Sequence, residues 1–258
     1  GGVAFLKSPV GQMFHQFFGE NMLRADVCNA VDELGQLLDH TGPVAASERN
    51  AARIFNSDHL FFVTNGTSTS NKIVWHSTVA PDDIVVVDRN CHKSILHSIM
   101  MTGAVPVFLM PTRNHYGIIG PIPKSEFDME NIQKKININP FIKDKTKKPR
   151  ILTITQSTYD GILYNVDAIK EKLDGKIDTL HFDEAWLPHA TFHKFYHGMH
   201  AIGRDRPRSK ESVVFSTQST HKLLAGLSQA SQILVQDSET RKLDYDTFNE
   251  AYLMHAST

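Results

Sequence analysis

The sequence has little cysteine, no excess of charge of either sign and no long hydrophobic run. Cys28 and Cys91 are its only cysteines, which argues against a disulfide framework or a cysteine-based zinc site and makes the reducing cytoplasm the expected compartment. Its 27 Lys and Arg residues balance 28 Asp and Glu residues. The chain therefore has no excess positive charge to attract nucleic acid or an anionic membrane. No apolar run approaches the length that spans a bilayer. We therefore expect neither nucleic acid nor membrane as a partner.

The remaining composition, 41% hydrophobic and 21% charged residues, is that of an ordinary globular chain with ample core. The chain starts at Gly1 rather than at Met, without a signal-peptide pattern, and stops at Thr258 without a helix stop signal. We expect it to be a portion of a longer protein.

Short apolar runs alternate with helical patterns along most of the chain. Strands are expected at residues 60–63, 84–87, 105–110, 150–155, 179–182, 213–215 and 232–235. Helices are expected at 47–55 (capped by Ser47), 71–78, 93–102, 166–173 and 245–254, with an interrupted helical region at 10–35 and a polar turn at 66–70. This pattern predicts an α/β fold with a mostly parallel central sheet and helices on both faces. Ligands bind such sheets beyond the carboxyl ends of the strands.

A lysine follows one of these strand ends behind a run of hydroxyl residues. The segment Ser216–Lys222 reads Ser-Thr-Gln-Ser-Thr-His-Lys after the apolar run 213–215. Such a lysine suits a Schiff base with pyridoxal 5'-phosphate (PLP), since the hydroxyls can donate to phosphate oxygens. A buried Ser/Thr-rich turn that happens to contain a lysine is the plainer alternative.

A second polar segment, Asn65–Asn71, joins a strand to a helix. Its backbone N–H groups and hydroxyls would converge where the helix dipole favours an anion, although a simple helix cap explains it as well. It contains neither a Walker A lysine nor a Gly-x-Gly-x-x-Gly pattern, which disfavours nucleotide phosphates.

His92 and Asp183 also follow strands. His92 at a strand-to-helix switch can stack on an aromatic cofactor, and Asp183 at the end of a buried strand needs a cationic partner such as a protonated pyridine nitrogen. Local capping is the alternative for each. Together, an anion turn, a stacking histidine, a buried aspartate and Lys222 account for the phosphate, ring face, ring nitrogen and aldehyde of PLP.

Three weaker signals have plainer interpretations. The spacing of four histidines would hold zinc on a regular helix, but the segment is aromatic and irregular, so we expect no metal site there; the four are His189, His193, His197 and His200. The charge run 143–148 is typical of a solvated loop, and Cys91 of a small core residue.

With these residues the sequence resembles the prokaryotic ornithine/lysine/arginine decarboxylases, PLP enzymes of the aspartate-aminotransferase fold. The likeness runs over essentially the whole chain and is carried by Asn65–Thr69, Asp88–Ser94, Pro111–Asn114, Ser157–Gly161, His181–Asp183, Gln218–Leu224 and Phe248–Tyr252.

The resemblance implies a role for each site residue. Lys222 would form the Schiff base, Asp183 would pair with the pyridine nitrogen and His92 would stack on the ring. The phosphate contacts would be Thr67, Ser68, Ser219 and His221, with Thr69 close by. Trp186 would line the site, and Ser257 would reach the phosphate of a neighbouring subunit.

The resemblance further implies a cytoplasmic homodimer with a shared active site, or a higher oligomer such as a decamer. Residues 1–258 would form the PLP-binding large domain, incomplete at its C-terminal end, with the wing and C-terminal domains outside this chain. The activity would be decarboxylation of a basic amino acid with proton consumption, as in acid resistance. An aminotransferase of the same fold, or a non-catalytic fragment that acts only in assembly, are the alternatives.

The substrate is less determined than the reaction. Gly66–Thr69 is most similar to the inducible lysine decarboxylases, which favours lysine and its product cadaverine. Glu184, which follows Asp183, is instead typical of the arginine enzymes. Arginine and ornithine therefore stay open.

Overall fold

The computed structural model describes residues 3–25, 31–226 and 228–256, and the chain divides into two compact units, Gly1–Ala45 and Ala46–Thr258. The first unit holds α1 (Val3–Lys7), α2 (Pro9–Ala25), the short 3₁₀ helix η1 (Asp32–Leu34) and the start of α3 (Gly42–Phe55). Helix α2 is interrupted at Gly19, whose φ of 78° lies outside the helical region. The expected interrupted helical region is thus confirmed for its described residues.

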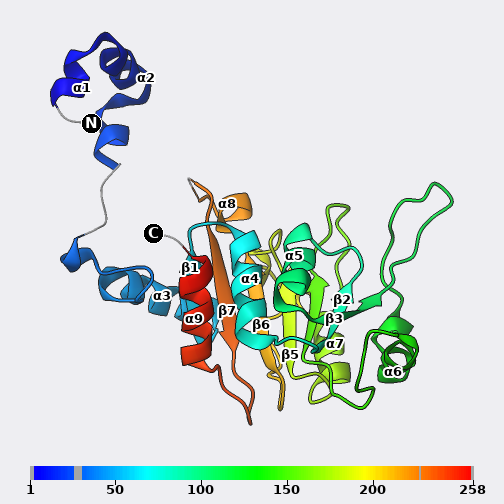
Figure 1. Cartoon of the computed structure of the whole chain (residues 1–258). Helices are drawn as coiled ribbons and strands as arrows, with labels where there is room; N and C mark the ends of the chain where they lie inside the picture. The colour runs from blue at the N-terminus through cyan, green and yellow to red at the C-terminus, as the bar shows by residue number, and fades with distance from the viewer. Residues whose placement is uncertain (1–2, 26–30, 227, 257–258) are drawn as a thin grey trace. The chain divides into compact units, whose positions relative to one another are not determined.

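A seven-stranded sheet forms the centre of the second unit (Figure 1). Its strands are β1 (His59–Val63), β2 (Ile84–Asp88), β3 (Val105–Leu109), β4 (Ile151–Thr155), β5 (Thr179–Asp183), β6 (Val213–Gln218) and β7 (Ser231–Gln236). They lie in the order β1-β7-β6-β5-β4-β2-β3; β7 runs antiparallel to both of its neighbours, β1 and β6, and the pairs from β6 to β3 are parallel. This confirms the expected mostly parallel α/β sheet.

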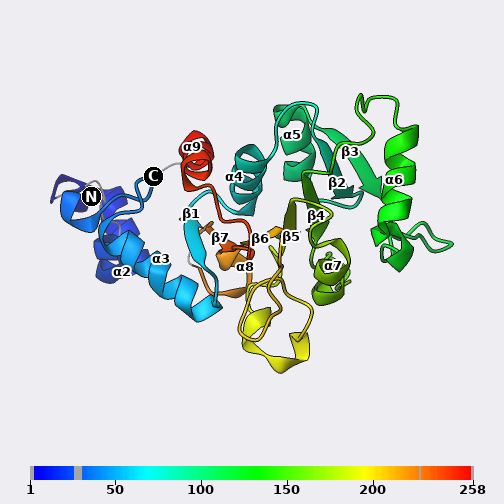
Figure 2. The same ribbon diagram turned by 90° about the horizontal axis from the view of Figure 1, so that it is seen from below.

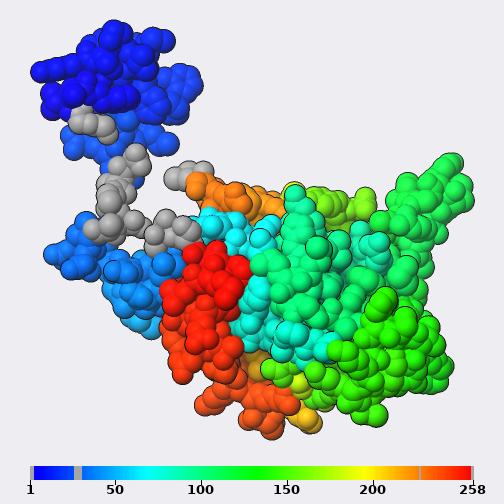
Figure 3. Space-filling view, in the orientation of Figure 1, coloured from blue at the N-terminus to red at the C-terminus, as the bar shows by residue number. Residues whose placement is uncertain are grey.

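Helices cover both faces of this sheet, as Figure 2 shows along its edge. On one face lie α4 (Thr67–Thr78), α5 (Lys93–Thr102) and α9 (Tyr245–His255). On the other lie α7 (Val166–Leu173) and the 3₁₀ turns η3 (Ala190–Phe192) and η4 (Lys194–Tyr196). Near β3, η2 (Lys124–Phe127) and α6 (Met129–Ile138) complete the unit, and a loop around the isolated bridge Arg113–Ile119 projects from its surface (Figure 3).

The central strands are buried along their whole length, but not only by apolar residues. Every residue of β2, β5, β6 and β7 is buried. In β5 and β6 polar side chains such as His181, Asp183 and Thr217 replace the apolar ones toward the carboxyl ends. Buried polar groups need partners inside the protein, so these strand ends mark the place where a site is built.

Three expected boundaries were wrong. Strand β6 continues to Gln218, three residues beyond its predicted end. Helix α4 begins at Thr67, inside the predicted turn, because Gly66 serves as its N-cap with a φ of 78°. Helix α3 begins at Gly42, so Ser47 lies within the helix and does not cap it. Among the helices of the described residues, none combines the length and the apolar character needed to cross a bilayer.

Candidate functional site

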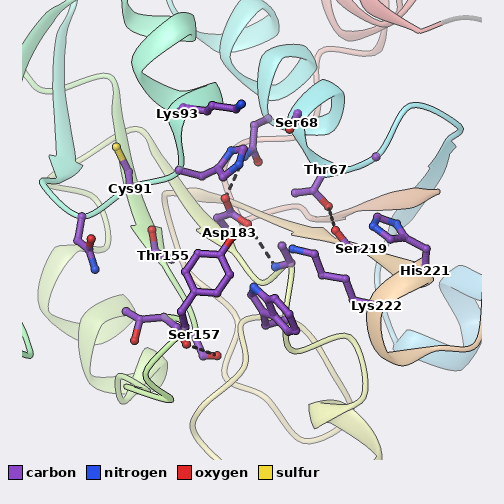
Figure 4. Close-up of a pocket in the computed structure, with 18 of the residues that line it drawn as sticks. Thr67, Ser68, Cys91, Lys93, Thr155, Ser157, Asp183, Ser219, His221 and Lys222 are labelled. Carbon is purple, nitrogen blue, oxygen red and sulfur yellow. Dashed lines mark hydrogen bonds between the residues drawn. The ribbon is translucent and has the colours of Figure 1, made fainter. Parts of the chain in front are cut away.

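A cavity of about 490 Å³ opens at the carboxyl ends of the parallel strands β2, β4, β5 and β6 (Figure 4). Eight of the residues expected at the site line it: Thr67, Ser68, His92, Asp183, Trp186, Ser219, His221 and Lys222. The expected convergence of the four strand-end motifs is therefore seen in the fold. Thr69 lies one residue beyond Ser68 in α4 and is not part of the cavity wall. Ser257 lies outside the described residues.

One end of the cavity is built from the first turn of α4 and the end of β6. Thr67 Oγ1 and Ser219 Oγ lie 2.7 Å apart, so the two hydroxyls face the same point (Figure 4). A Cβ on Gly66 would lie 2.7 Å from Gln229 Nε2, so glycine is the residue that fits here without moving Gln229. The two hydroxyls and the amides of a helix N-terminus favour a phosphate or another anion here.

Asp183 forms the floor of the cavity at the end of β5. Its side chain is 4% exposed, and its two oxygens accept hydrogen bonds from Asn71 Nδ2 at 2.9 Å and from the Ala185 N–H at 3.2 Å. Burial raises the pKa of this carboxyl, while the hydrogen bonds and the charges of His92 and Lys222 oppose the rise. A carboxylate in this position is stabilised by a cation placed above it.

Lys222 reaches the cavity from α8 (Thr220–Leu223), the short helix that follows β6. Its Nζ lies 4.5 Å from the centre of the Trp186 ring, and Tyr159 packs edge-on against that ring at 5.6 Å. Burial lowers the pKa of the Lys222 amine, and the charge of Asp183 opposes the shift. A lysine with a lowered pKa is more often in the neutral, nucleophilic form.

His92 is the N-cap residue of α5. Its Nδ1 accepts a hydrogen bond from the Ser94 N–H at 3.2 Å and lies 2.8 Å from Ser94 Oγ. Burial lowers the pKa of the imidazole, which favours its neutral form. The capping alternative and the cavity-lining role are thus compatible, because the cap uses one ring nitrogen and leaves the ring face at the cavity wall.

The cavity also contains residues to which the sequence assigned no role. Asn71 bridges Asp183 and Ser94, and Tyr159 and Thr155 add to the wall. Asn71 belonged to the expected phosphate segment, but its contact with a residue 112 positions away has no local signal. Cys91, expected in the core, lies at the cavity wall, and burial raises the pKa of its thiol to about 12.

Glu184 does not line this cavity. Its side chain is fully buried and accepts hydrogen bonds from Ser216 Oγ at 2.5 Å, Gln218 Nε2 at 3.0 Å and the Ala201 N–H at 2.6 Å. Burial raises the pKa of the carboxyl to about 7, against the effect of these hydrogen bonds. Glu184 thus ties the end of β6 to the long β5–β6 connection.

The four histidines considered for zinc do not share a helix face. They lie on and around the separate turns η3 and η4. His189 Nε2 lies 3.3 Å from the Tyr196 hydroxyl, and His197 Nε2 lies 2.7 Å from Arg206 Nη2. Within residues 3–25, 31–226 and 228–256, no group of three or more His, Cys, Asp or Glu side chains is arranged to hold a metal ion.

Comparison with protein families matches the whole chain, residues 1–258, to the major domain of the Orn/Lys/Arg decarboxylases. Lysine decarboxylase LdcA of Pseudomonas aeruginosa is 59% identical over the full chain, and the inducible lysine decarboxylase of Escherichia coli K12 is 47% identical. The biodegradative arginine decarboxylase of E. coli K12 is 46% identical. The chain covers 34% of each, so it spans about a third of the length of these curated relatives.

Solved structures give the same assignment. Lysine decarboxylase A from P. aeruginosa superposes with a TM-score of 0.91 at 59% identity, over all of this chain and 34% of that one. A serine palmitoyltransferase solved with PLP superposes with a TM-score of 0.54 at 12% identity, over 82% of this chain and 46% of that one, which shows a shared fold alone.

Proposed function

Because the chain belongs to the ornithine/lysine/arginine decarboxylase family, we propose that it forms the PLP-binding large domain of a decarboxylase that acts on a basic amino acid. One observation carries the proposal: Lys222, the buried Asp183 and the Thr67–Ser219 hydroxyl pair line a single cavity. The amine matches the aldehyde of PLP, the carboxyl its ring nitrogen and the hydroxyls its phosphate. These residues are far apart in the sequence, so their convergence in one cavity argues for a common ligand.

The residues present fit PLP by their chemistry. The hydroxyls of Thr67 and Ser219 and the amides that begin α4 suit a phosphate. Asp183 is a buried carboxyl that needs a cation, and a protonated pyridine nitrogen is one. Lys222 supplies an amine of lowered pKa for the aldehyde. His92 stays a proposal as the residue that stacks on the ring.

Bound PLP supplies an electron-withdrawing ring that stabilises negative charge at the substrate Cα as CO2 leaves. The residues of the protein would hold and orient the cofactor and the substrate. Asp183 would hold a negative charge toward the ring nitrogen, and the hydroxyls of Thr67 and Ser219 would hold the phosphate. Lys222 Nζ lies 4.5 Å from the centre of the Trp186 ring, a position in which its protonated form would be stabilised. From there Lys222 would be the group that delivers a proton to the substrate Cα, so that one proton would be consumed for each CO2 released.

We infer lysine as the favoured substrate, since lysine decarboxylases lie among the relatives at 47–59% identity. Arginine is the second choice because a relative named as an arginine decarboxylase is 46% identical. Glu184 does not decide between them by contact, because its side chain lies outside the cavity. A cytoplasmic dimer with a shared site, assembled into a higher oligomer such as a decamer, completes the proposal.

The test is product analysis with PLP and each of lysine, arginine and ornithine. We expect CO2 and the corresponding amine in equal amounts, and loss of turnover in Lys222→Ala. Lys172→Ala is the matched control, because Lys172 lies on α7, pairs with Asp128 before α6 and does not line the cavity. A keto acid as product would identify an aminotransferase instead. Near-native turnover of Lys222→Ala would refute the assignment of the lysine.

A further inference from the structure

A chain of buried polar side chains approaches Asp183 from behind the cavity. Asn71 Nδ2 donates to Asp183 Oδ2 at 2.9 Å, and Asn71 Oδ1 accepts from Thr217 Oγ1 at 2.7 Å. Behind Thr217 stands His181, whose Nε2 lies 3.0 Å from Thr217 Oγ1. These side chains are almost fully buried, with Asp183 the most exposed at 4%. Their hydrogen bonds therefore operate without competition from water.

The direction of each bond follows from the one before it. Thr217 has a single hydroxyl proton and donates it to Asn71, so it must accept from His181, which puts a proton on His181 Nε2. Burial lowers the pKa of His181 to about 3, so the ring is neutral and its Nδ1 is an acceptor. Thr153 Oγ1, 3.1 Å from Nδ1, is then the donor, and it accepts in turn from Trp75 Nε1 at 3.2 Å. All five bonds point toward Asp183.

The same amide serves the second cofactor-facing residue. The other N–H of Asn71 donates to Ser94 Oγ at 2.9 Å, so the Ser94 hydroxyl is free to donate to His92 Nδ1 at 2.8 Å. The Ser94 N–H reaches the same ring nitrogen at 3.2 Å. His92 Nδ1 is thereby an acceptor, and the ring proton belongs on Nε2. A single side chain thus orients both Asp183 and His92.

We propose that Asn71 is a positioning residue for the cofactor. At the end of the one-way hydrogen-bond chain from Trp75, it would hold Asp183 as an acceptor for the ring nitrogen and His92 in its Nε2–H tautomer. The inference rests on the proposed PLP function. An amide has no proton to lose in the physiological range, so its donation does not change with pH. Bonds aligned in one direction polarise each other, which strengthens the last bond onto the carboxylate.

The decisive experiment uses the intact PLP-saturable protein and two ligands, PLP and an analogue with carbon in place of the ring nitrogen, 1-deazapyridoxal phosphate. Asn71→Leu keeps roughly the size of the side chain and removes both donors without adding a charge beside Asp183. We expect it to weaken PLP binding about 10- to 100-fold, the loss of a hydrogen bond to a charged group, and to weaken the analogue less than about threefold. Thr217→Val, which leaves Asn71 in place, should show the same preference with a smaller loss.

The matched control is Ser70→Ala. It removes a buried hydroxyl of the same helix, which pairs with Ser231 Oγ at 2.7 Å and makes no contact with Asp183, and it should bind both ligands as the unchanged protein does. Equal losses for both ligands in Asn71→Leu, or none, would overturn the inference. If the unchanged protein binds no PLP, the proposed function fails as well.

The direction of the chain has its own test, which does not depend on PLP. Neutron crystallography of the intact protein should place deuterium on Nε2 of His181 and leave Nδ1 bare. Deuterium on Nδ1 would contradict the one-way chain, whatever the affinity for PLP.

Discussion

Replacing Glu184 with glutamine should remove a large part of the pH dependence of folding stability. Burial raises the pKa of the folded Glu184 carboxyl to about 7, well above its ordinary value. The folded state therefore binds the proton more tightly than the unfolded state. The stability that the protonated Glu184 carboxyl contributes is fully present below its pKa in the unfolded chain. It is lost as the pH rises through its pKa in the folded protein. Between pH 5 and pH 8 the loss amounts to about 2–3 kcal/mol.

Glutamine suits the site because it stays neutral and still accepts from the Ala201 N–H and donates to Ser216 Oγ. One hydrogen bond is lost, because the Gln218 Nε2 donor would then face the amide NH2 of the new glutamine, which is also a donor. The buried Lys170, whose pKa burial lowers to about 8, titrates at the upper end of this window, so the values from pH 5 to pH 7 carry the comparison.

Urea unfolding followed by circular dichroism at pH 5, 6, 7 and 8 measures the effect in both proteins. The unfolding free energy of the unchanged protein should fall with pH by about 2–3 kcal/mol more than that of Glu184→Gln. The comparison subtracts other titrating groups, including Asp183, because both proteins share them. Parallel pH curves would refute a buried Glu184 carboxyl with a raised pKa.

Three further outcomes follow from the same structure. Asp183→Asn should lower the rate of decarboxylation by a factor equivalent to about 2–4 kcal/mol while PLP still attaches to the protein, and steady-state kinetics with an unchanged rate would exclude its ring-nitrogen role. Gly66→Ala should weaken PLP in fluorescence titrations, because a Cβ would approach Gln229 at a φ of 78°; Gly117→Ala, with a φ of 81° and open space, should share only the backbone strain. Burial, reinforced by His76, lowers the pKa of His255 to about 4, so stability is lost as the pH falls from about 6.5 to 4. His255→Gln should flatten that acid limb in thermal melts, and an unchanged limb would exclude His255 as its source.

The alternation of strands and helices was predictable from the sequence because parallel strands buried on both faces are continuous apolar runs. The same reasoning placed the polar motifs at strand ends, and hence Lys222, Asp183 and His92 in one cavity. The start of α4 was missed because its first turn, Thr67–Ser70, contains only hydroxyl residues, which favour turns as much as helices.

The interactions behind the cavity were not predictable in the same way. Asn71 and Glu184 have ordinary local surroundings in the sequence, and their partners come from distant strands, with Thr217 146 positions from Asn71 and Ser216 32 from Glu184. The antiparallel insertion of β7 between β1 and β6 is likewise a matter of topology, because a strand pattern carries no direction. Only the three-dimensional structure brings these groups together.

The central claim is that Lys222 is the covalent anchor for PLP. Reduction of the PLP-saturated intact protein with borohydride, followed by peptide mapping, tests it most directly. The account predicts a pyridoxyl group on the peptide that contains Lys222, and on no other lysine at comparable yield. A modified lysine elsewhere, or none at all, would contradict it.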